Sequence, residues 1–185
     1  ITVLRHVAAE FLLYEQRTPG ELFRASFFAG GVCRTKIPQV PEEEQRMILV
    51  NGQWQGGGDP VTCAAAEDLW RTYLPGKAVE RVEIDQPPLP EKRHSVRGYD
   101  AILRQTERSW ALLRQRQPDR LFTLGGGCDA DVASIAYLNE QARGDLTVFW
   151  FDAHGDLNAP EESASGLFYG MPARVLMQPQ DGFLP

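Results

Sequence analysis

The sharpest pattern in the sequence is an apolar and β-branched run over residues 146–151, followed at once by alternating polar and small residues. Such a run is typical of an interior strand of a parallel sheet that helices cover on both faces. The polar residues after it are Asp152, His154 and Asp156, each separated from the next by one small residue. We therefore expect a buried strand that delivers three polar side chains from its carboxyl end.

The chain must bend after this strand if the polar side chains act together. Fully extended, at about 3.3 Å per residue, Asp152 and Asp156 would lie roughly 13 Å apart, too far to share an ion at bonds of about 2.1 Å. Gly155 permits a bend. Carboxylates held within about 4 Å repel by roughly 4 kcal/mol at an effective dielectric of about 20, so the cluster needs protons or cations.

Metal ions are one of two interpretations of this cluster. Two divalent ions would neutralise the carboxylates, and imidazole with carboxylate suits Mn, Zn, Fe or Co better than Ca. The alternative is a solvated turn in which His154 is incidental. The position directly after a buried strand favours the metal site, because ligands of open α/β sheets bind at the carboxyl ends of strands.

The rest of the hydrophobic pattern alternates between strand-like and helix-like stretches. Short apolar runs predict strands, and apolar stripes with helical spacing predict helices. We expect strands over residues 47–50, 81–84 and 120–124, and helices that begin at Pro60 and span residues 100–115 and 131–141. This order predicts an α/β fold of three α/β/α layers with a mostly parallel sheet and right-handed crossovers.

Two glycine-rich turns follow predicted strands, at residues 56–58 and 125–127. Neither fits a dinucleotide or phosphate loop, which disfavours a nucleotide-binding domain. Cys128 follows the second turn. A buried cysteine is usually a small hydrophobe, but beside carboxylates and imidazole its thiolate is a credible metal ligand. Asp129 and Asp131 compete for that role or cap the following helix.

We divide the chain into a poorly readable extension over residues 1–46 and an α/β domain over residues 47–185. Residues 7–14 allow a short helix, which the later Pro and Gly residues interrupt. The sequence begins with Ile1 rather than Met and shows no closing element before Pro185. We therefore expect a fragment or an unusual gene product.

Composition narrows the partners and the compartment. The 185 residues are 43% hydrophobic and 24% charged, which is typical of a globular protein, and the net charge is −6. No basic block stands out, which argues against a nucleic acid or an anionic membrane as partner. No apolar stretch reaches the roughly 20 residues of a membrane span. Three scattered cysteines argue for a reducing compartment, so we expect a cytoplasmic protein.

Two stretches resemble a known family. Residues 121–129 read LFTLGGGCD, and residues 146–172 read LTVFWFDAHGDLNAPEESASGLFYGMP. They resemble the arginase, agmatinase and formimidoylglutamase family of ureohydrolases, whose members carry GGDH and then DAHxDxN…SGNxHG. The match spans about residues 47–177 and is most specific over residues 124–172. It implies an arginase-like fold that is incomplete on its C-terminal side.

The resemblance also implies a metal centre with two Mn(II) ions that activate water for attack on a guanidinium carbon. By this resemblance Asp152 bridges the ions, Asp156 binds the first ion and His154 binds the second. His154 and Asp156 are then the catalytic residues. Cys128 stands where the family usually has a His ligand, and its softer, anionic thiolate shifts the preference from Mn toward Zn or Fe. Gly127 replaces the preceding Asp.

Further positions correspond to the family's substrate-binding region. Asn158, Ser163 and Ser165 fall where the family holds the α-amino and carboxylate groups of its substrate. Tyr169 stands where, by the resemblance, the family has a His in the role of proton shuttle. A phenol with a pKa near 10 is a poor proton shuttle at neutral pH. Leu167 replaces a substrate-binding Asn. The family's later Asp-x-Asp ligand pair does not appear in residues 167–185.

These residues support two functional hypotheses. The first is a metal-dependent hydrolase of a guanidino or amidino C–N bond, which releases urea or a related product from a small substrate. The second is a catalytically inactive family member that acts as a structural or regulatory subunit, because Cys128, Leu167 and Tyr169 are substitutions at functional positions. The resemblance further implies a homo-oligomer, a trimer or a hexamer.

Overall fold

The computed structural model describes residues 11–15, 45–86, 88–89 and 92–178. Its main sheet has four strands in the order β1-β6-β2-β3. Strand β2 pairs in parallel with β3 and with β6, and β1 pairs antiparallel with β6. The predicted mostly parallel sheet is thus confirmed. The strands are β1 (Phe11–Glu15), β2 (Arg46–Asn51), β3 (Glu80–Arg81) and β6 (Arg120–Gly125).

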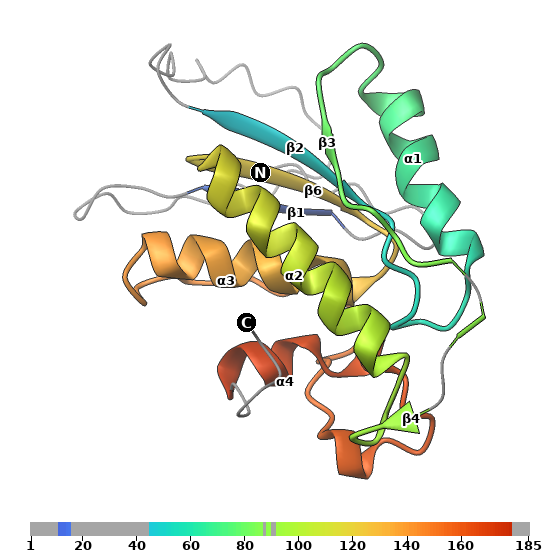
Figure 1. Cartoon of the computed structure of the whole chain (residues 1–185). Coiled ribbons are helices and arrows are strands. Elements are labelled where there is room, and N and C mark those ends of the chain that lie inside the picture. Colours follow the sequence, from blue (N-terminus) through green and yellow to red (C-terminus); the bar gives the residue numbers. More distant parts are fainter. Residues whose placement is uncertain (1–10, 16–44, 87, 90–91, 179–185) are drawn as a thin grey trace, which may run out of the picture.

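Helices cover both faces of this sheet (Figure 1). Side chains alternate between the faces along each strand, so Met47 and Leu121 pack in one core cluster with Leu113 of α2, whereas Val50 and Leu124 pack in another with α1. The predicted three-layer α/β/α arrangement is therefore confirmed. The helices are α1 (Val61–Tyr73), α2 (Tyr99–Arg116), α3 (Val132–Gln141) and α4 (Pro172–Met177).

A second group of elements lies beyond the carboxyl end of the sheet. The two-stranded hairpin β4 (Lys92–Arg93) and β5 (Val96–Arg97) precedes α2, and three short 3₁₀ helices follow β6. The hairpin and the last of these 3₁₀ helices share a buried cluster with the first turns of α2 and α3 and with α4, which includes Val96, Phe168 and Met171. The 3₁₀ helices are η1 (Cys128–Asp131), η2 (Pro160–Glu162) and η3 (Phe168–Gly170).

The amino-terminal strand differs from the sequence-based expectation. The short helix allowed over residues 7–14 is wrong for residues 11–14, which belong to β1; residues 7–10 lie outside the described part of the chain. Pairing with β6 explains the difference, because every residue of β1 has a partner between Arg120 and Leu124. A local helical pattern cannot compete with such a ladder.

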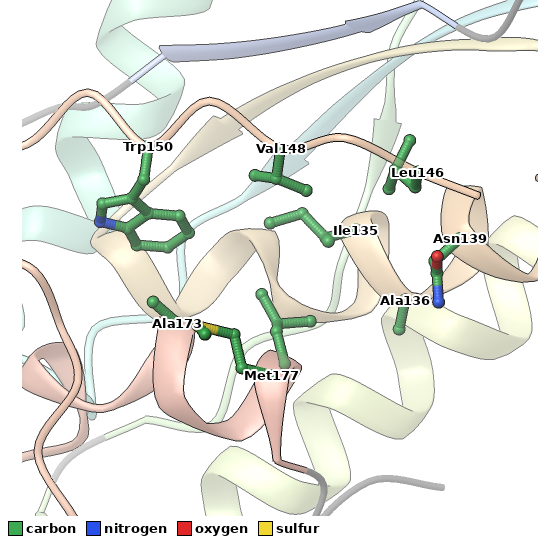
Figure 2. Close-up of a pocket in the computed structure, with 9 residues that line it drawn as sticks. Ile135, Ala136, Asn139, Leu146, Val148, Trp150, Ala173 and Met177 are labelled. Atoms are coloured by element: carbon green, nitrogen blue, oxygen red, sulfur yellow. The ribbon is translucent and has the colours of Figure 1, made fainter. Parts of the chain in front are cut away.

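The predicted buried strand over residues 146–151 is also wrong. This segment belongs to no strand among the described residues, since the neighbour of β6 on that side is β1. The segment is half-buried, and Figure 2 shows Leu146, Val148 and Trp150 pointing toward α3 and α4. The alternate residues face outward, with Phe149 51% exposed. Only the face that carries Leu146, Val148 and Trp150 is buried, as the apolar run predicted.

Between this segment and the two helices lies a cavity of about 460 Å³. Its other walls are formed by Ile135, Ala136 and Asn139 of α3 and by α4 (Figure 2). Within residues 11–15, 45–86, 88–89 and 92–178 there is no helix with both the length and the apolar composition that a membrane crossing needs.

Candidate metal centre

The first part of the site is the glycine turn that follows β6. A Cβ atom on Gly126 would lie 2.5 Å from the carbonyl oxygen of Gln53, so the turn can pack against the loop after β2 only because this residue has no side chain. A Cβ on Gly127 would lie 2.9 Å from the carboxylate of Asp129. The turn leads directly into η1, which begins at Cys128.

The second part is the bend that follows the half-buried segment. The Asp152 carboxylate accepts a hydrogen bond of 2.8 Å from the backbone N–H of His154, which starts the bend. Asp156 has a φ of +51°, a left-handed conformation that Asp tolerates better than most residues. The predicted bend is thus present, although its left-handed residue is Asp156 rather than Gly155. The Asp156 carbonyl accepts a hydrogen bond of 3.1 Å from the backbone N–H of Arg174 in α4.

These two turns bring Cys128, Asp152 and Asp156 together. Each offers one ligand atom, and the three atoms lie within 4.8 Å of one another. The Cys128 thiol also donates a hydrogen bond of 3.5 Å to Asp152 Oδ2. One thiol and two carboxylates from turns 24 residues apart in sequence therefore converge on a single point.

The electrostatics of the cluster favour a cation. Burial raises the pKa of Asp156, and the nearby charge of Asp152 raises it further. The Cys128 thiol, the charge of His154 and the Trp150 indole N–H act in the opposite direction. Even so, no group in the described part of the chain completes a hydrogen bond to the buried Asp156 Oδ2. A buried carboxylate oxygen without a donor, facing a second carboxylate and a thiol, fits a divalent metal ion.

His154 lies at the edge of this cluster and is not part of it. Its side chain is 77% exposed, and its Nδ1 lies 3.5 Å from Asp152 Oδ1. The exposed ring and the buried carboxylates thus face different environments. The predicted role of His154 as a metal ligand and catalytic residue stays a prediction.

Asp129 and Asp131, the other ligand candidates of the glycine turn, are both buried and lie outside the cluster. Asp129 instead accepts a hydrogen bond of 2.6 Å from the Gln53 amide. Burial raises the pKa of Asp129 to about 6, although hydrogen bonds from Gln53 and from backbone N–H groups oppose the shift. Sequence reasoning missed Gln53; its position in a loop after a strand was the available signal.

The residues predicted to bind substrate lie on the segment that follows the cluster. The backbone N–H of Asn158 donates to the Gly170 carbonyl at 3.0 Å, and that of Tyr169 donates to the Gly56 carbonyl at 3.1 Å. The Ser163 and Ser165 hydroxyl oxygens lie 3.4 Å apart. The Tyr169 side chain is 41% exposed. Their contacts with a substrate stay a prediction.

Known proteins that this chain resembles belong to one family. The model of the arginase family matches residues 70–182, which is more than half of the chain and includes the whole cluster. An arginase of Staphylococcus aureus (strain MRSA252) is 35% identical over 98 residues, which cover 50% of this chain and 31% of that protein. An arginase of Plasmodium berghei is 32% identical over 83 residues, which cover 44% of this chain and 23% of that protein.

Among solved structures, an arginase of Entamoeba histolytica in complex with L-ornithine is similar, with a TM-score of 0.53 over 70% of this chain and 48% of that chain. Its sequence identity is 20%, so this likeness concerns the fold alone. The chain spans less than a third of the length of the two curated relatives that it matches. The match of the family model and the arginase-like fold lead to one conclusion: this chain belongs to the arginase family.

Proposed function

We propose that the chain contributes metal ligands to the active site of a metal-dependent hydrolase, one that cleaves a guanidino or amidino C–N bond. The observation that carries the proposal is the convergence of Cys128, Asp152 and Asp156 within 4.8 Å. A partly buried thiol and two carboxylates in such proximity repel one another when ionised, and a divalent cation removes that repulsion. Membership of the arginase family supports the same class of reaction.

Cys128, Asp152 and Asp156 would hold the metal, and His154 would serve a second ion after a rotation of its exposed ring. A bound divalent ion would supply Lewis-acid chemistry, lowering the pKa of water toward neutrality for attack on the guanidinium carbon. The thiolate makes Zn or Fe a better match than the Mn that the family resemblance implies. Asn158, Ser163, Ser165 and Tyr169 would bind and orient the substrate.

The metal content of the purified protein tests this proposal. We expect one or two Zn, Fe or Mn ions per chain by elemental mass spectrometry after purification without chelator. Cys128→Ser should lower that content and shift the remaining metal toward Mn. Cys63→Ser is the matched control, because Cys63 is also a free cysteine but lies outside the cluster. Absence of metal from the wild-type protein would overturn the proposal, and its presence would justify screening guanidino substrates for urea release.

A second candidate is a catalytically inactive family member that serves as a structural or regulatory subunit. The observation in its favour is that His154 lies outside the cluster, with Tyr169 41% exposed where the resemblance implies a proton shuttle. A metal-loaded protein that releases no urea from any guanidino substrate, and that keeps its stability after Asp152→Asn, would favour this candidate. The expected homo-oligomer and the cytoplasmic location likewise stay predictions.

A further inference from the structure

We infer that the β4–β5 hairpin holds the predicted carboxylate-binding serines in their working conformation, with Arg97 as the positioning residue. The inference rests on the proposed function, because it concerns the same substrate. It adds a residue far from the metal cluster in sequence and with no ligand role. We call residues 163–166, which contain Ser163 and Ser165, the serine loop.

The hairpin donates hydrogen bonds to three consecutive backbone carbonyls of the serine loop. The Lys92 ammonium donates to the carbonyl of Ala164 at 3.4 Å, and Arg97 Nε donates to that of Ser165 at 3.1 Å. The backbone N–H of Arg97 donates to the carbonyl of Gly166 at 2.8 Å. Arg97 therefore binds two adjacent carbonyls, one with its side chain and the other with its backbone N–H, and this fixes the orientation of the two peptide groups.

The packing between hairpin and loop is close. Gly166 has a φ of +67°, and a Cβ atom there would lie 2.7 Å from the Lys92 ammonium nitrogen and 2.7 Å from the Ser95 carbonyl oxygen. Gly166 is buried although Ala164 and Ser165 beside it are exposed. The hairpin is thus the surface against which an otherwise exposed loop is ordered.

This arrangement leaves the serine hydroxyls ready to donate. Ser163 Oγ accepts a hydrogen bond of 3.0 Å from the backbone N–H of Gly166, and Ser165 Oγ accepts one of 3.2 Å from that of Leu167. Each hydroxyl has one proton to donate. A backbone donor occupies one of the two lone pairs of each oxygen, and the two hydroxyls share one long hydrogen bond of 3.4 Å, in which one of them donates to the other. One proton is therefore free, and the second becomes free when an acceptor with two oxygens, such as a carboxylate, replaces that mutual bond.

The consequence for the reaction is a separation between binding and chemistry. Arg97 lies on the hairpin and touches the loop, not the metal cluster. Loss of its side chain should free the Ser165 carbonyl, so a substrate would have to order the loop on binding. Substrate binding should weaken while the rate of the chemical step stays nearly unchanged.

The test compares Arg97→Met with Arg93→Met. Arg93→Met removes the same charge from the same hairpin. The Arg93 guanidinium, however, forms an ion pair with the Asp100 carboxylate at 2.6 Å and does not bind the serine loop. Hydrogen exchange of the Gly166 and Leu167 amides is measured by NMR, together with kcat and KM for urea release from L-arginine, agmatine and 4-guanidinobutyrate. For Arg97→Met we expect about tenfold faster exchange and about tenfold higher KM for the carboxylate-bearing substrates, with kcat within about twofold.

The outcomes separate the two ideas. Unchanged exchange in Arg97→Met, or the same increase in Arg93→Met, overturns the positioning role whatever the activity. Faster exchange with unchanged KM in an active enzyme also overturns it. If the wild-type protein releases no urea from any of the three compounds, the proposed function fails, and the exchange rates alone decide whether Arg97 orders the loop.

Discussion

The amide nitrogen of Gln53 donates a hydrogen bond of 2.6 Å to the carboxylate of Asp129, 76 residues away in the sequence. Both side chains are buried, and the bond joins the loop after β2 to the 3₁₀ helix that presents Cys128. The bond therefore fixes the loop after β2 against the 3₁₀ helix in which Cys128 lies. No group in the described residues completes a hydrogen bond to the second oxygen of Asp129, Oδ1, so the ionised carboxylate is only half compensated.

The first prediction concerns the pH dependence of stability in the metal-free protein. The pKa of Asp129 rises from 3.8 to about 6 on folding because the group is buried. Between these values the folded state keeps a proton that the unfolded chain has released, so the free energy of unfolding falls as the pH rises and levels off above about 6. Asp129→Asn cannot ionise. Its stability relative to wild type should therefore improve by about 1–2 kcal/mol between pH 5 and pH 7.5.

Urea denaturation at the two pH values measures this difference. Asp145→Asn, which removes an exposed carboxylate from the turn after α3, controls for the loss of one negative charge. A stability difference between Asp129→Asn and wild type that does not vary with pH would contradict the prediction.

The second prediction concerns the glycine turn. Gly126→Ala places a Cβ 2.5 Å from the Gln53 carbonyl oxygen and 3.1 Å from the Gly52 carbonyl carbon, and backbone atoms cannot move aside as a side chain end can. We expect a loss of about 1–3 kcal/mol in the free energy of unfolding. Gly57→Ala is the control, because its Cβ would meet nothing closer than the Trp54 carbonyl at 3.9 Å. Equal stability of the two variants would show that the turn is looser than the structure indicates.

Much of the fold was predictable from local patterns. The strands β2 and β6 and the helices α1, α2 and α3 lie within a few residues of their predicted bounds, because each combines a clear period with a Gly, Pro or Asp at its end. The segment over residues 146–151 failed for a different reason. Its apolar residues indicate that one face is buried, but a strand also requires a neighbour, and among the described strands β1 and β2 occupy the two sides of β6.

The sequence indicated the residues of the candidate site but not their arrangement. Residue type and position after strand-like runs led to four predicted ligands, Cys128, Asp152, His154 and Asp156, of which the structure brings Cys128, Asp152 and Asp156 within 4.8 Å of one another. The His154 side chain is exposed and Asp156 is left-handed, and no residue pattern predicts either feature. The position of Gln53 after a predicted strand placed it near the site, but its contact joins two loops distant in sequence, so local patterns could not identify Asp129 as its partner.

The third prediction concerns a buried amide network beneath the loop that carries Gln53. Gln105 is fully buried, accepts a hydrogen bond of 2.9 Å from the backbone N–H of Asp85 and donates one of 2.9 Å to the Gln55 side chain. Gln105→Leu removes the acceptor of the part-buried Asp85 N–H and one of the two donors to Gln55 Oε1, which keeps the hydrogen bond from the Trp54 backbone N–H, so we expect a loss of about 1–3 kcal/mol.

Thermal and urea unfolding check this loss. Gln115→Leu is the matched control, because it makes the same substitution at an exposed position of the same helix, and it should change stability by less than about 0.5 kcal/mol. A Gln105→Leu variant as stable as Gln115→Leu would mean that water satisfies the Asp85 and Gln55 groups.

The last prediction concerns the identity of the soft ligand in the metal centre. Co(II) is a spectroscopic substitute for Zn(II), and a thiolate bound to it produces an intense near-ultraviolet charge-transfer band that carboxylates and imidazole do not produce. Cys128 must lose its proton to bind, so the band should appear together with proton release and should weaken as the pH falls. Cobalt-loaded wild-type protein and Cys63→Ser should both show the band, and Cys128→Ser should lack it while Asp152 and Asp156 still bind the ion weakly. A band that survives in Cys128→Ser would assign the thiolate to another cysteine, and cobalt binding without any band would leave the two carboxylates as the ligands and remove the reason to prefer Zn or Fe over Mn.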